Sequence, residues 1–290
     1  MALSIAVTPS SNSRMPRTAV LRRAVRCSSA ASVPTTQPDL RNYWTSLISD
    51  VDRKLNDAVP LKYPELIHES MRYSLLAKTA KRAPPVMCIA ACELFGGDRA
   101  AAIPTVCALE MVHAASFVHD DLPYIDDALS RRGQLPNHTL YGPDMAILAG
   151  DALLPLAFQY IVLHTPTQLV SQLDLLRVVQ EIARAVGSTG MAATQFIGEN
   201  KFGELGRCSA VCGALLGGAS DEEIERLGEY GRIVGILYRV VEDMLEGKKV
   251  NIGVVEDLKS RARKELYMFE KYGDKVLPLH TFIDYAAERV

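Results

Sequence analysis

Four aspartates fall within eight positions and follow directly on an apolar run. They are Asp120, Asp121, Asp126 and Asp127, and the preceding run, Val112 to Val118, has the spacing of a buried helix. Because carboxylates gathered at a helix end repel one another, a bound cation would be their natural counter-charge. Oxygen ligands of this kind suit Mg²⁺, which holds a few carboxylates and completes its shell with water and phosphate. The competing interpretation is a solvated acidic loop.

The spacing inside this segment decides which aspartates can meet. Asp120 and Asp126 would lie about 120° apart on an unbroken helix, but Pro123 disfavours an unbroken helix. A loop could bring Asp126 back beside Asp120. The pair Arg131 and Arg132 follows closely, and guanidinium groups that grip phosphate beside carboxylates that hold Mg²⁺ indicate a diphosphate site.

The elements that must position these residues are helices. After Pro38, apolar residues recur at intervals of three and four, and strand signals are nearly absent. Ser220 with Glu223 three residues later is a capping box, which marks a helix start. We therefore expect an all-α domain over residues 39–290, with about ten helices around a central cavity.

One apolar run, Met145 to Leu163, is long enough to be considered as a membrane span. It contains Asp151 and Pro155, so the sequence favours a buried core helix over a transmembrane segment.

The first 38 residues differ in composition from the rest of the chain. They hold five Arg and many Ser but no acidic residue, which predicts a disordered, cleaved transit peptide. Their Ser, Thr and Pro content favours chloroplast over mitochondrion, and a plain basic tail is the alternative. Removing these five from the 32 Lys and Arg leaves 27 basic against 34 acidic residues, so we expect no nucleic-acid partner.

Asp-Asp-x4-Asp followed by Arg-Arg-Gly resembles the first aspartate-rich motif of the trans-isoprenyl diphosphate synthases. The segments 67–76 and 148–154 are also similar to that family. The resemblance implies an apolar pocket among helices, with Mg²⁺ at its mouth, where isopentenyl diphosphate condenses with an allylic diphosphate. It implies that Asp120 and Asp126, supported by Asp121, bind Mg²⁺ and that Arg131 holds the allylic diphosphate. Contacts to isopentenyl diphosphate would come from Lys81, His113 and Arg132.

Other positions depart from the family pattern in ways that weaken turnover. The second aspartate-rich motif, which by the resemblance is a further metal site, appears in degenerate form as Glu242, Asp243 and Glu246. Immediately before it, the family's Phe-Gln is replaced by Tyr238-Arg239. An expected phosphate-binding Arg is Pro84, and the family's Lys-Thr pair is Lys201-Phe202. Each lost charge-assisted hydrogen bond could cost about 1.5 to 3 kcal/mol.

Two Cys-x3-Cys motifs provide a separate signal, Cys88 with Cys92 and Cys208 with Cys212. Residues four apart share a helix face, so these thiols suit packing against another helix. Zinc binding is weakly indicated, because Cys-x2-Cys spacing is missing. Together with the degenerate second motif, the Cys pairs resemble the small subunits of plant heterodimeric geranyl and geranylgeranyl diphosphate synthases, where they serve association with the catalytic large subunit.

The resulting hypothesis is a small regulatory subunit, weakly active or inactive alone, in a plastid isoprenoid pathway. It would bind a catalytic geranylgeranyl diphosphate synthase large subunit as a heterodimer and change its activity and product length. The alternatives are a self-sufficient Mg²⁺-dependent prenyltransferase and another metal-binding helical protein such as a terpene cyclase. The sequence leaves open the partner, the ten- or twenty-carbon product, and a stromal or thylakoid-associated location.

Overall fold

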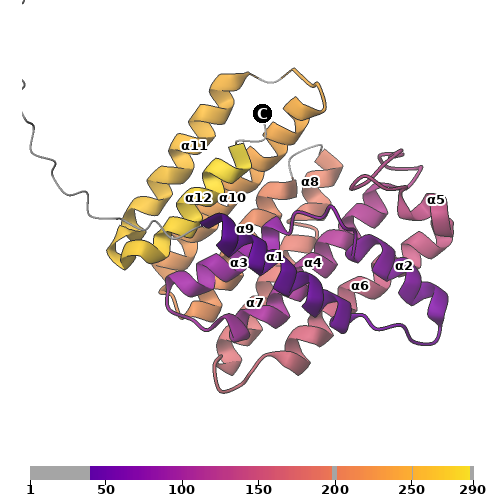
Figure 1. The fold of residues 1–290 in the computed structure, drawn as a ribbon, viewed down its shortest axis with the longest axis horizontal. Helices are drawn as coiled ribbons and strands as arrows, with labels where there is room; N and C mark the ends of the chain where they lie inside the picture. Colours follow the sequence, from indigo (N-terminus) through magenta and orange to yellow (C-terminus); the bar gives the residue numbers. More distant parts are fainter. Residues whose placement is uncertain (1–39, 198–200, 250, 288–290) are drawn as a thin grey trace, which may run out of the picture. The chain divides into compact units, whose positions relative to one another are not determined.

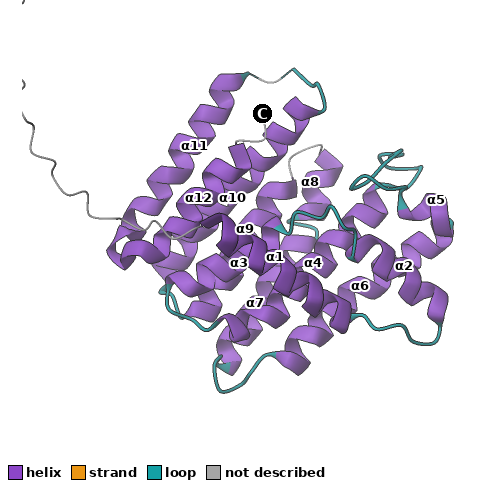
Figure 2. Ribbon diagram, in the orientation of Figure 1, coloured by secondary structure: helices purple, strands orange, loops and turns teal. Residues whose placement is uncertain are grey.

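The computed structural model describes residues 40–197, 201–249 and 251–287. The predicted transit peptide, residues 1–38, lies outside this part of the chain. The described residues form twelve α-helices and one 3-10 helix without a strand (Figures 1 and 2), which confirms the all-α prediction. Ten of the α-helices have 11 residues or more, in agreement with the expected number.

The helices follow one another in this order: α1 (Leu40–Ala58), α2 (Glu65–Leu75), α3 (Ala83–Leu94), α4 (Arg99–Asp120), α5 (Asn137–Tyr141), α6 (Pro143–His164), α7 (Gln172–Val186), α8 (Met191–Ile197), α9 (Lys201–Gly217), α10 (Asp221–Leu245), α11 (Ile252–Leu266), the 3-10 helix η1 (Tyr267–Val276) and α12 (Leu277–Ala287).

Two helices, α4 and α9, form the centre of the helical unit. The α9 helix packs against α3, α7 and α10, while α4 packs against α3 and α6. Both are apolar around most of their circumference, with almost every residue of α9 buried. A helix without a polar face is stable in water only when other helices cover it on all sides.

The beginning of α9 lies against α10 with the two backbones in contact. A side chain added at Gly206 would collide with the carbonyl oxygen of Gly231, and one added at Gly231 would collide with that of Gly206. Gly235 meets the carbonyl oxygen of Phe202 in the same way. The glycines therefore set a short distance between the helices, and this fixes Lys201 and Phe202 beside the second half of α10.

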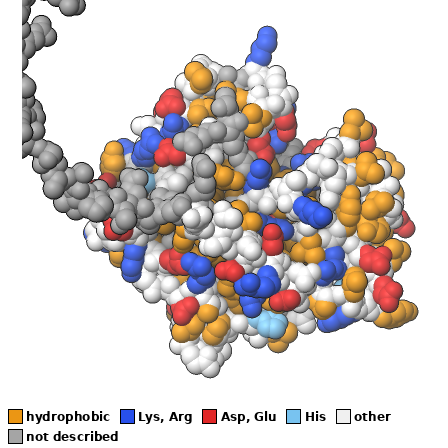
Figure 3. All heavy atoms as spheres, in the orientation of Figure 1, with side chains coloured by type: hydrophobic (Ala, Val, Ile, Leu, Met, Phe, Trp, Pro, Cys, Tyr) orange, Lys and Arg blue, Asp and Glu red, His pale blue; other side chains and the backbone are white. Residues whose placement is uncertain are grey.

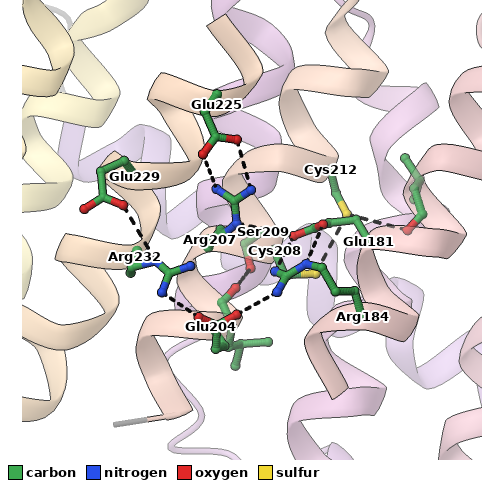
Figure 4. Close-up of polar contacts among 12 residues, drawn as sticks. Glu181, Arg184, Glu204, Arg207, Cys208, Ser209, Cys212, Glu225, Glu229 and Arg232 are labelled. Atoms are coloured by element: carbon green, nitrogen blue, oxygen red, sulfur yellow. Dashed lines mark hydrogen bonds and ion pairs between the residues drawn. The ribbon is translucent and has the colours of Figure 1, made fainter. Parts of the chain in front are cut away.

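Ion pairs hold the same region from the other side (Figure 4). Glu204 on α9 is buried and pairs with Arg184 of α7 and Arg232 of α10, both at 2.9 Å. Arg207 on α9 reaches Glu225 of α10 at 3.1 Å. These contacts join α7, α9 and α10, so the start of α9 is held by side chains of both neighbouring helices.

The helix ends of α4 and α10 carry recognisable caps. Asp98 accepts a hydrogen bond from the backbone of Ala100 and starts α4, and the predicted capping box of Ser220 and Glu223 is present at the start of α10. Gly247 has a left-handed backbone (φ +81°), and the Lys248 amide donates to the Asp243 carbonyl at 2.9 Å. This Schellman turn ends α10 and folds the chain back over its last residues.

The α6 helix is less buried than the sequence suggested. By length and composition both α4 and α6 could cross a membrane, but the most apolar window of α4 is 83% buried and that of α6 only 33%. The prediction of a buried core helix at Met145 to Leu163 is therefore correct for one face alone. Its other face carries apolar side chains into solvent, because the described residues provide no helix to cover it.

Candidate functional site

A cavity of about 670 Å³ lies between α3, α4, α9 and α10. It corresponds to the apolar pocket among helices that the family resemblance implied. Its wall is largely apolar, and its charged lining residues come from the loops before α3 and after α4 and from the end of α10. The apolar lining includes Met87, Phe117, Leu205, Val234 and Phe282, and the charged lining includes Lys81, Arg131, Arg132, Glu242 and Glu246.

Glu110, in the middle of α4, is a fully buried carboxylate that organises one side of the site. Its Oε1 accepts hydrogen bonds from Arg82 Nη1 at 2.6 Å and from Arg132 Nη2 at 2.8 Å. Burial alone would raise the pKa of Glu110, but the charges of Arg132 and Arg82 hold that pKa well below its ordinary value. The carboxylate is thus ionised and fixes both guanidinium groups, Arg132 being one of the predicted substrate ligands.

His113 lines the cavity one turn after Glu110. Its Nδ1 is 3.6 Å from Glu110 Oε2, and neither ring nitrogen has a hydrogen-bond partner among the described residues. Burial lowers the pKa of His113 despite the nearby carboxylate, so the ring is neutral near pH 7. Lys81, the other residue predicted to contact isopentenyl diphosphate, is exposed at the rim.

The first aspartate segment turns back on itself after α4. The Asp126 amide donates to the Asp120 carbonyl at 2.9 Å, so the loop around Pro123 returns Asp126 to Asp120 as the sequence indicated. The Asp120 carboxylate is buried and forms an ion pair with Lys201. The Asp126 carboxylate is exposed and accepts a hydrogen bond from Gln195 Nε2 at 3.4 Å.

Arg131 and Asp121 form a bidentate pair beside this segment. Arg131 Nη2 donates to Asp121 Oδ1 at 2.5 Å, and Arg131 Nε donates to Oδ1 at 2.9 Å and to Oδ2 at 3.2 Å. Burial nevertheless raises the pKa of Asp121 above its ordinary value. The guanidinium also lies over the ring of Phe117 at 4.4 Å, with Arg132 at 5.3 Å and Lys201 at 5.7 Å from the same ring. One aromatic ring thus gathers three cations at the cavity mouth.

The first segment suits Mg²⁺ chemically. Asp120 and Asp126 offer hard oxygen ligands, and Mg²⁺ is commonly held by one or two carboxylates with phosphate and water completing its shell. No group of three or more His, Cys, Asp or Glu residues is placed to hold a metal ion among the described residues. An ion here would therefore depend on oxygen atoms from a bound ligand, and the assignment of Asp120, Asp121 and Asp126 as metal ligands stays a prediction.

The second acidic segment, Glu242, Asp243 and Glu246, lies at the end of α10. Arg239 on the same helix reaches Asp243 at 2.7 Å, Glu246 at 3.7 Å and Glu242 at 4.0 Å. Lys248 reaches Asp243 at 2.7 Å and Glu246 at 3.1 Å. These carboxylates do not fit a metal site as they stand, because two cations of the chain already lie among them.

Phe202 lies between the aromatic rings of α4 and Arg239 of α10. Its ring centroid lies 6.1 Å from that of Phe117 and 6.2 Å from that of His113, and Arg239 lies over the ring at 5.7 Å. Pro84 also lines the cavity. Where the family pattern has a hydroxyl and a guanidinium, this cavity therefore presents an aromatic ring and a proline, neither of which donates a hydrogen bond to phosphate from its side chain.

The four motif cysteines lie inside the helical unit, where α3 packs against α9. Their residues are 0 to 1% exposed, and the Sγ atoms of Cys208 and Cys212 are 4.0 Å apart (Figure 4). Burial raises the pKa of Cys88, Cys92 and Cys212, so these groups are neutral thiols. Their role in subunit interaction stays a prediction, and their burial means that bulky polar replacements would disturb folding as well as pairing.

Three parts of the site were missed at the level of sequence. Glu110 could have been found as the acidic residue inside the apolar stretch of α4, three positions before His113. The contacts of Arg239 could also have been predicted, because the residues at i+3, i+4 and i+7 share its helix face. The aromatic position of Phe117 had no signal in its spacing, since the cations around it come from separate segments.

Comparison with known proteins gives one matching family model, polyprenyl synthetase, over residues 64–261. A chloroplastic heterodimeric geranylgeranyl pyrophosphate synthase small subunit of Arabidopsis thaliana is 56% identical, over 92% of this chain and 89% of that protein. The large subunit 1 of the heterodimeric enzyme from the same plant, also chloroplastic, is 39% identical over 87% of this chain and 80% of its own length.

Solved structures of similar proteins share the helical arrangement. A geranyl diphosphate synthase small subunit from Antirrhinum majus has a TM-score of 0.73 at 28% identity, covering 85% of this chain and 99% of that one. A deletion mutant of the heterotetrameric geranyl pyrophosphate synthase of mint has a TM-score of 0.72 at 29% identity, covering 83% and 98%.

Proposed function

The chain belongs to the polyprenyl synthetase family, and we propose that it is the small regulatory subunit of a heterodimeric geranylgeranyl or geranyl diphosphate synthase. In this role it binds a catalytic large subunit and modulates the activity and product length of that subunit. The similarity to a small subunit over nearly the whole chain supports this proposal. The single structural observation that carries it is the uncovered apolar face of α6.

This face is a continuous arc of the helix. Eight exposed residues of α6 fall within about 160° of the helical wheel: Asp144, Ile147, Leu148, Asp151, Pro155, Gln159, Val162 and Leu163. Three of them, Asp144, Asp151 and Gln159, are polar. The exposed fractions of Val162 and Leu163 are 61% and 67%. A solvent-facing arc of this composition indicates a surface that another protein covers.

A homologous synthase subunit suits this surface. The small subunit and the large subunit of Arabidopsis thaliana that resemble this chain are both described as parts of a heterodimeric enzyme, so a related helix of the large subunit is the occupant we propose. Hydrophobic side chains also gather at one end of the face drawn in Figure 3, over α2 and α5, interspersed with charged ones. That region is more mixed in composition than the α6 arc.

The polyprenyl synthetase family generally uses Mg²⁺. In this chain Asp120 and Asp126, with Asp121 beside them, would hold Mg²⁺, which would neutralise a bound diphosphate. Arg131 and Arg132 would bind an allylic or isopentenyl diphosphate, aided by Lys81 and His113. The apolar wall would exclude water from the bound chain. Without phosphate donors at Pro84 and Phe202, we propose weak turnover or none by this subunit alone.

We also propose a chloroplast location, which the plastid names of the relatives support. Residues 1–38 would be the transit peptide and the mature subunit would lie in the stroma. Import of the first 38 residues fused to a fluorescent protein into isolated chloroplasts would test this, and failure of import would contradict it.

The test of pairing uses the protein lacking residues 1–38, mixed with a chloroplastic geranylgeranyl diphosphate synthase. We expect co-elution in size-exclusion chromatography and a change in the rate or product length of the synthase. The double variant Leu148→Asp, Val162→Asp should lose co-elution while keeping its melting temperature, whereas Leu61→Asp, an exposed position off α6, should keep both. Robust turnover by this chain alone would instead support the self-sufficient prenyltransferase.

A further inference from the structure

The second acidic segment contains its own counter-ions, and they come from two directions. Arg239 lies N-terminal to the carboxylates, and its guanidinium reaches all three. Lys248 lies C-terminal to them and contacts Asp243 and Glu246. Three carboxylates thus face two cations, with the shortest contacts, at 2.7 Å, both on Asp243.

Both cations are placed by the local backbone. Arg239 is on the helix face of Glu242, Asp243 and Glu246, one to two turns earlier. The left-handed Gly247 and the backbone bond from Lys248 to Asp243 turn the chain so that the Lys248 side chain meets the carboxylates. The C-terminal end of a helix also carries partial negative charge, which favours cations at this position. These contacts are therefore built by α10 and its cap alone.

The Arg239 side chain is also held from outside its helix. Its guanidinium lies over the Phe202 ring at 5.7 Å, and the side chain is 26% exposed. From the other end of the segment, Lys248 Nζ donates a hydrogen bond to Asp243 Oδ1 at 2.7 Å and pairs with Glu246 at 3.1 Å. A divalent cation entering here would have to displace both cations and would be repelled by them.

We propose that Arg239 and Lys248 stand where the family pattern places a metal ion, and that this segment therefore binds no divalent cation. The two side chains act as internal counter-ions of the three carboxylates. The second of the two acidic segments is thereby lost as a metal site. This inference goes beyond the subunit role and is independent of any partner. Because the three carboxylates are retained, removal of the two cations should restore metal binding at this segment.

The experiment is a titration of the full chain with Mn²⁺, followed by electron paramagnetic resonance, in which free Mn²⁺ is counted. The double variant Arg239→Gln, Lys248→Gln should bind one additional Mn²⁺ per chain compared with the unmodified protein. The matched control is Arg226→Gln, which removes an Arg of the same helix that pairs with Glu265 and should bind no additional ion. Equal binding by the double variant and the unmodified protein would overturn the proposal, as would a gain in the control.

Further variants guard against misfolding. Arg239→Lys keeps the charge and should leave the Mn²⁺ stoichiometry unchanged. Asp243→Asn should change nothing in the unmodified protein but should abolish the additional ion in the double variant. A loss of Mn²⁺ from the unmodified protein on Asp243→Asn would overturn the proposal even if the double variant fails to fold. Co-elution with the large subunit is a separate measurement, so failure here does not bear on pairing.

Discussion

The two acidic segments lie at the ends of different helices, α4 and α10, and differ in how their charge is balanced. In the first, three of the four carboxylates have separate partners: Lys201 for Asp120, Arg131 for Asp121 and Gln195 for Asp126. In the second, one residue of the same helix, Arg239, contacts all three carboxylates. The number of acidic residues is similar, but their availability to a cation is not.

This difference teaches that acidic spacing alone does not define a metal site. In the first segment Lys201 and Gln195 are distant in sequence and Arg131 lies ten residues after Asp121. A diphosphate ligand could draw Arg131 and Lys201 to itself while the carboxylates accept a metal ion. In the second segment the partners are fixed by the helix and its cap. Whether an acidic segment can bind a metal ion therefore depends on whether a ligand can displace the cations paired with its carboxylates.

The largest loss of stability is expected on replacement of Glu110. This buried carboxylate holds Arg132, which lies near the first acidic segment. Replacing Glu110 with Gln would leave the buried Arg82 and Arg132 without their carboxylate. We expect a loss of about 3 to 5 kcal/mol in the free energy of unfolding, measured by chemical denaturation at pH 7. Glu246→Gln, whose side chain is 54% exposed, should lose less than about 1 kcal/mol.

The stability difference between Glu110→Gln and the unmodified protein should depend on pH. Since the pKa of Glu110 is lowered in the folded state from an ordinary value of 4.5, its stabilisation is complete above that pH and is lost as the pH falls below it. The difference between Glu110→Gln and the unmodified protein should therefore shrink below about pH 4.5. Equal losses for the two variants at pH 7 would contradict the anchoring role of Glu110.

An intermediate effect should separate the two segments directly. Asp126→Asn should weaken Mg²⁺-dependent binding of inorganic pyrophosphate by about 10- to 100-fold, because a charged oxygen ligand is lost. Asp243→Asn should change this affinity by no more than about twofold, since its charge is already balanced. Isothermal titration calorimetry with Mg²⁺ and pyrophosphate measures both. If Asp243→Asn weakened binding as much as Asp126→Asn, the comparison would fail.

The smallest effect concerns a carboxylate at the opposite end of α10. Glu223 accepts hydrogen bonds from Tyr272 Oη at 2.6 Å and the Ser220 amide at 2.9 Å and pairs with Lys271 at 2.8 Å. Although burial opposes the shift, these contacts lower the pKa of Glu223 to about 2. Glu223→Gln should cost about 1 kcal/mol of stability at pH 7, and the difference should fade as the pH falls from about 4.5 to about 2.

Glu223→Gln also serves as a control for the two acidic segments, because Glu223 contributes to stability and lies at the other end of α10. Pyrophosphate and Mn²⁺ binding should remain as in the unmodified protein, and thermal unfolding followed by circular dichroism measures the stability change. A change in Mn²⁺ stoichiometry in this variant would show that distant carboxylates on α10 influence the cation balance.

Much of the fold was predictable because its signals are local. The periodicity of apolar residues gave the helices, the capping box at Ser220 gave the start of α10, and Pro123 indicated the turn after α4. The exposed face of α6 was not predicted correctly, because an apolar helix buried in a core and one reserved for a partner have the same composition. Only the neighbouring helices distinguish them.

The sequence by itself determined the helices, the acidic and basic residue types, the apolar cavity wall and the two Cys pairs, all of which follow from residue identity and helical spacing. The tertiary structure decided the pairing of charges. Glu110 pairs with Arg132, Phe117 gathers three cations from two segments, and the buried Cys pairs meet where α3 packs against α9. The physical reason is that electrostatic and packing energies depend on distances between residues far apart in the chain, which spacing along one helix does not specify.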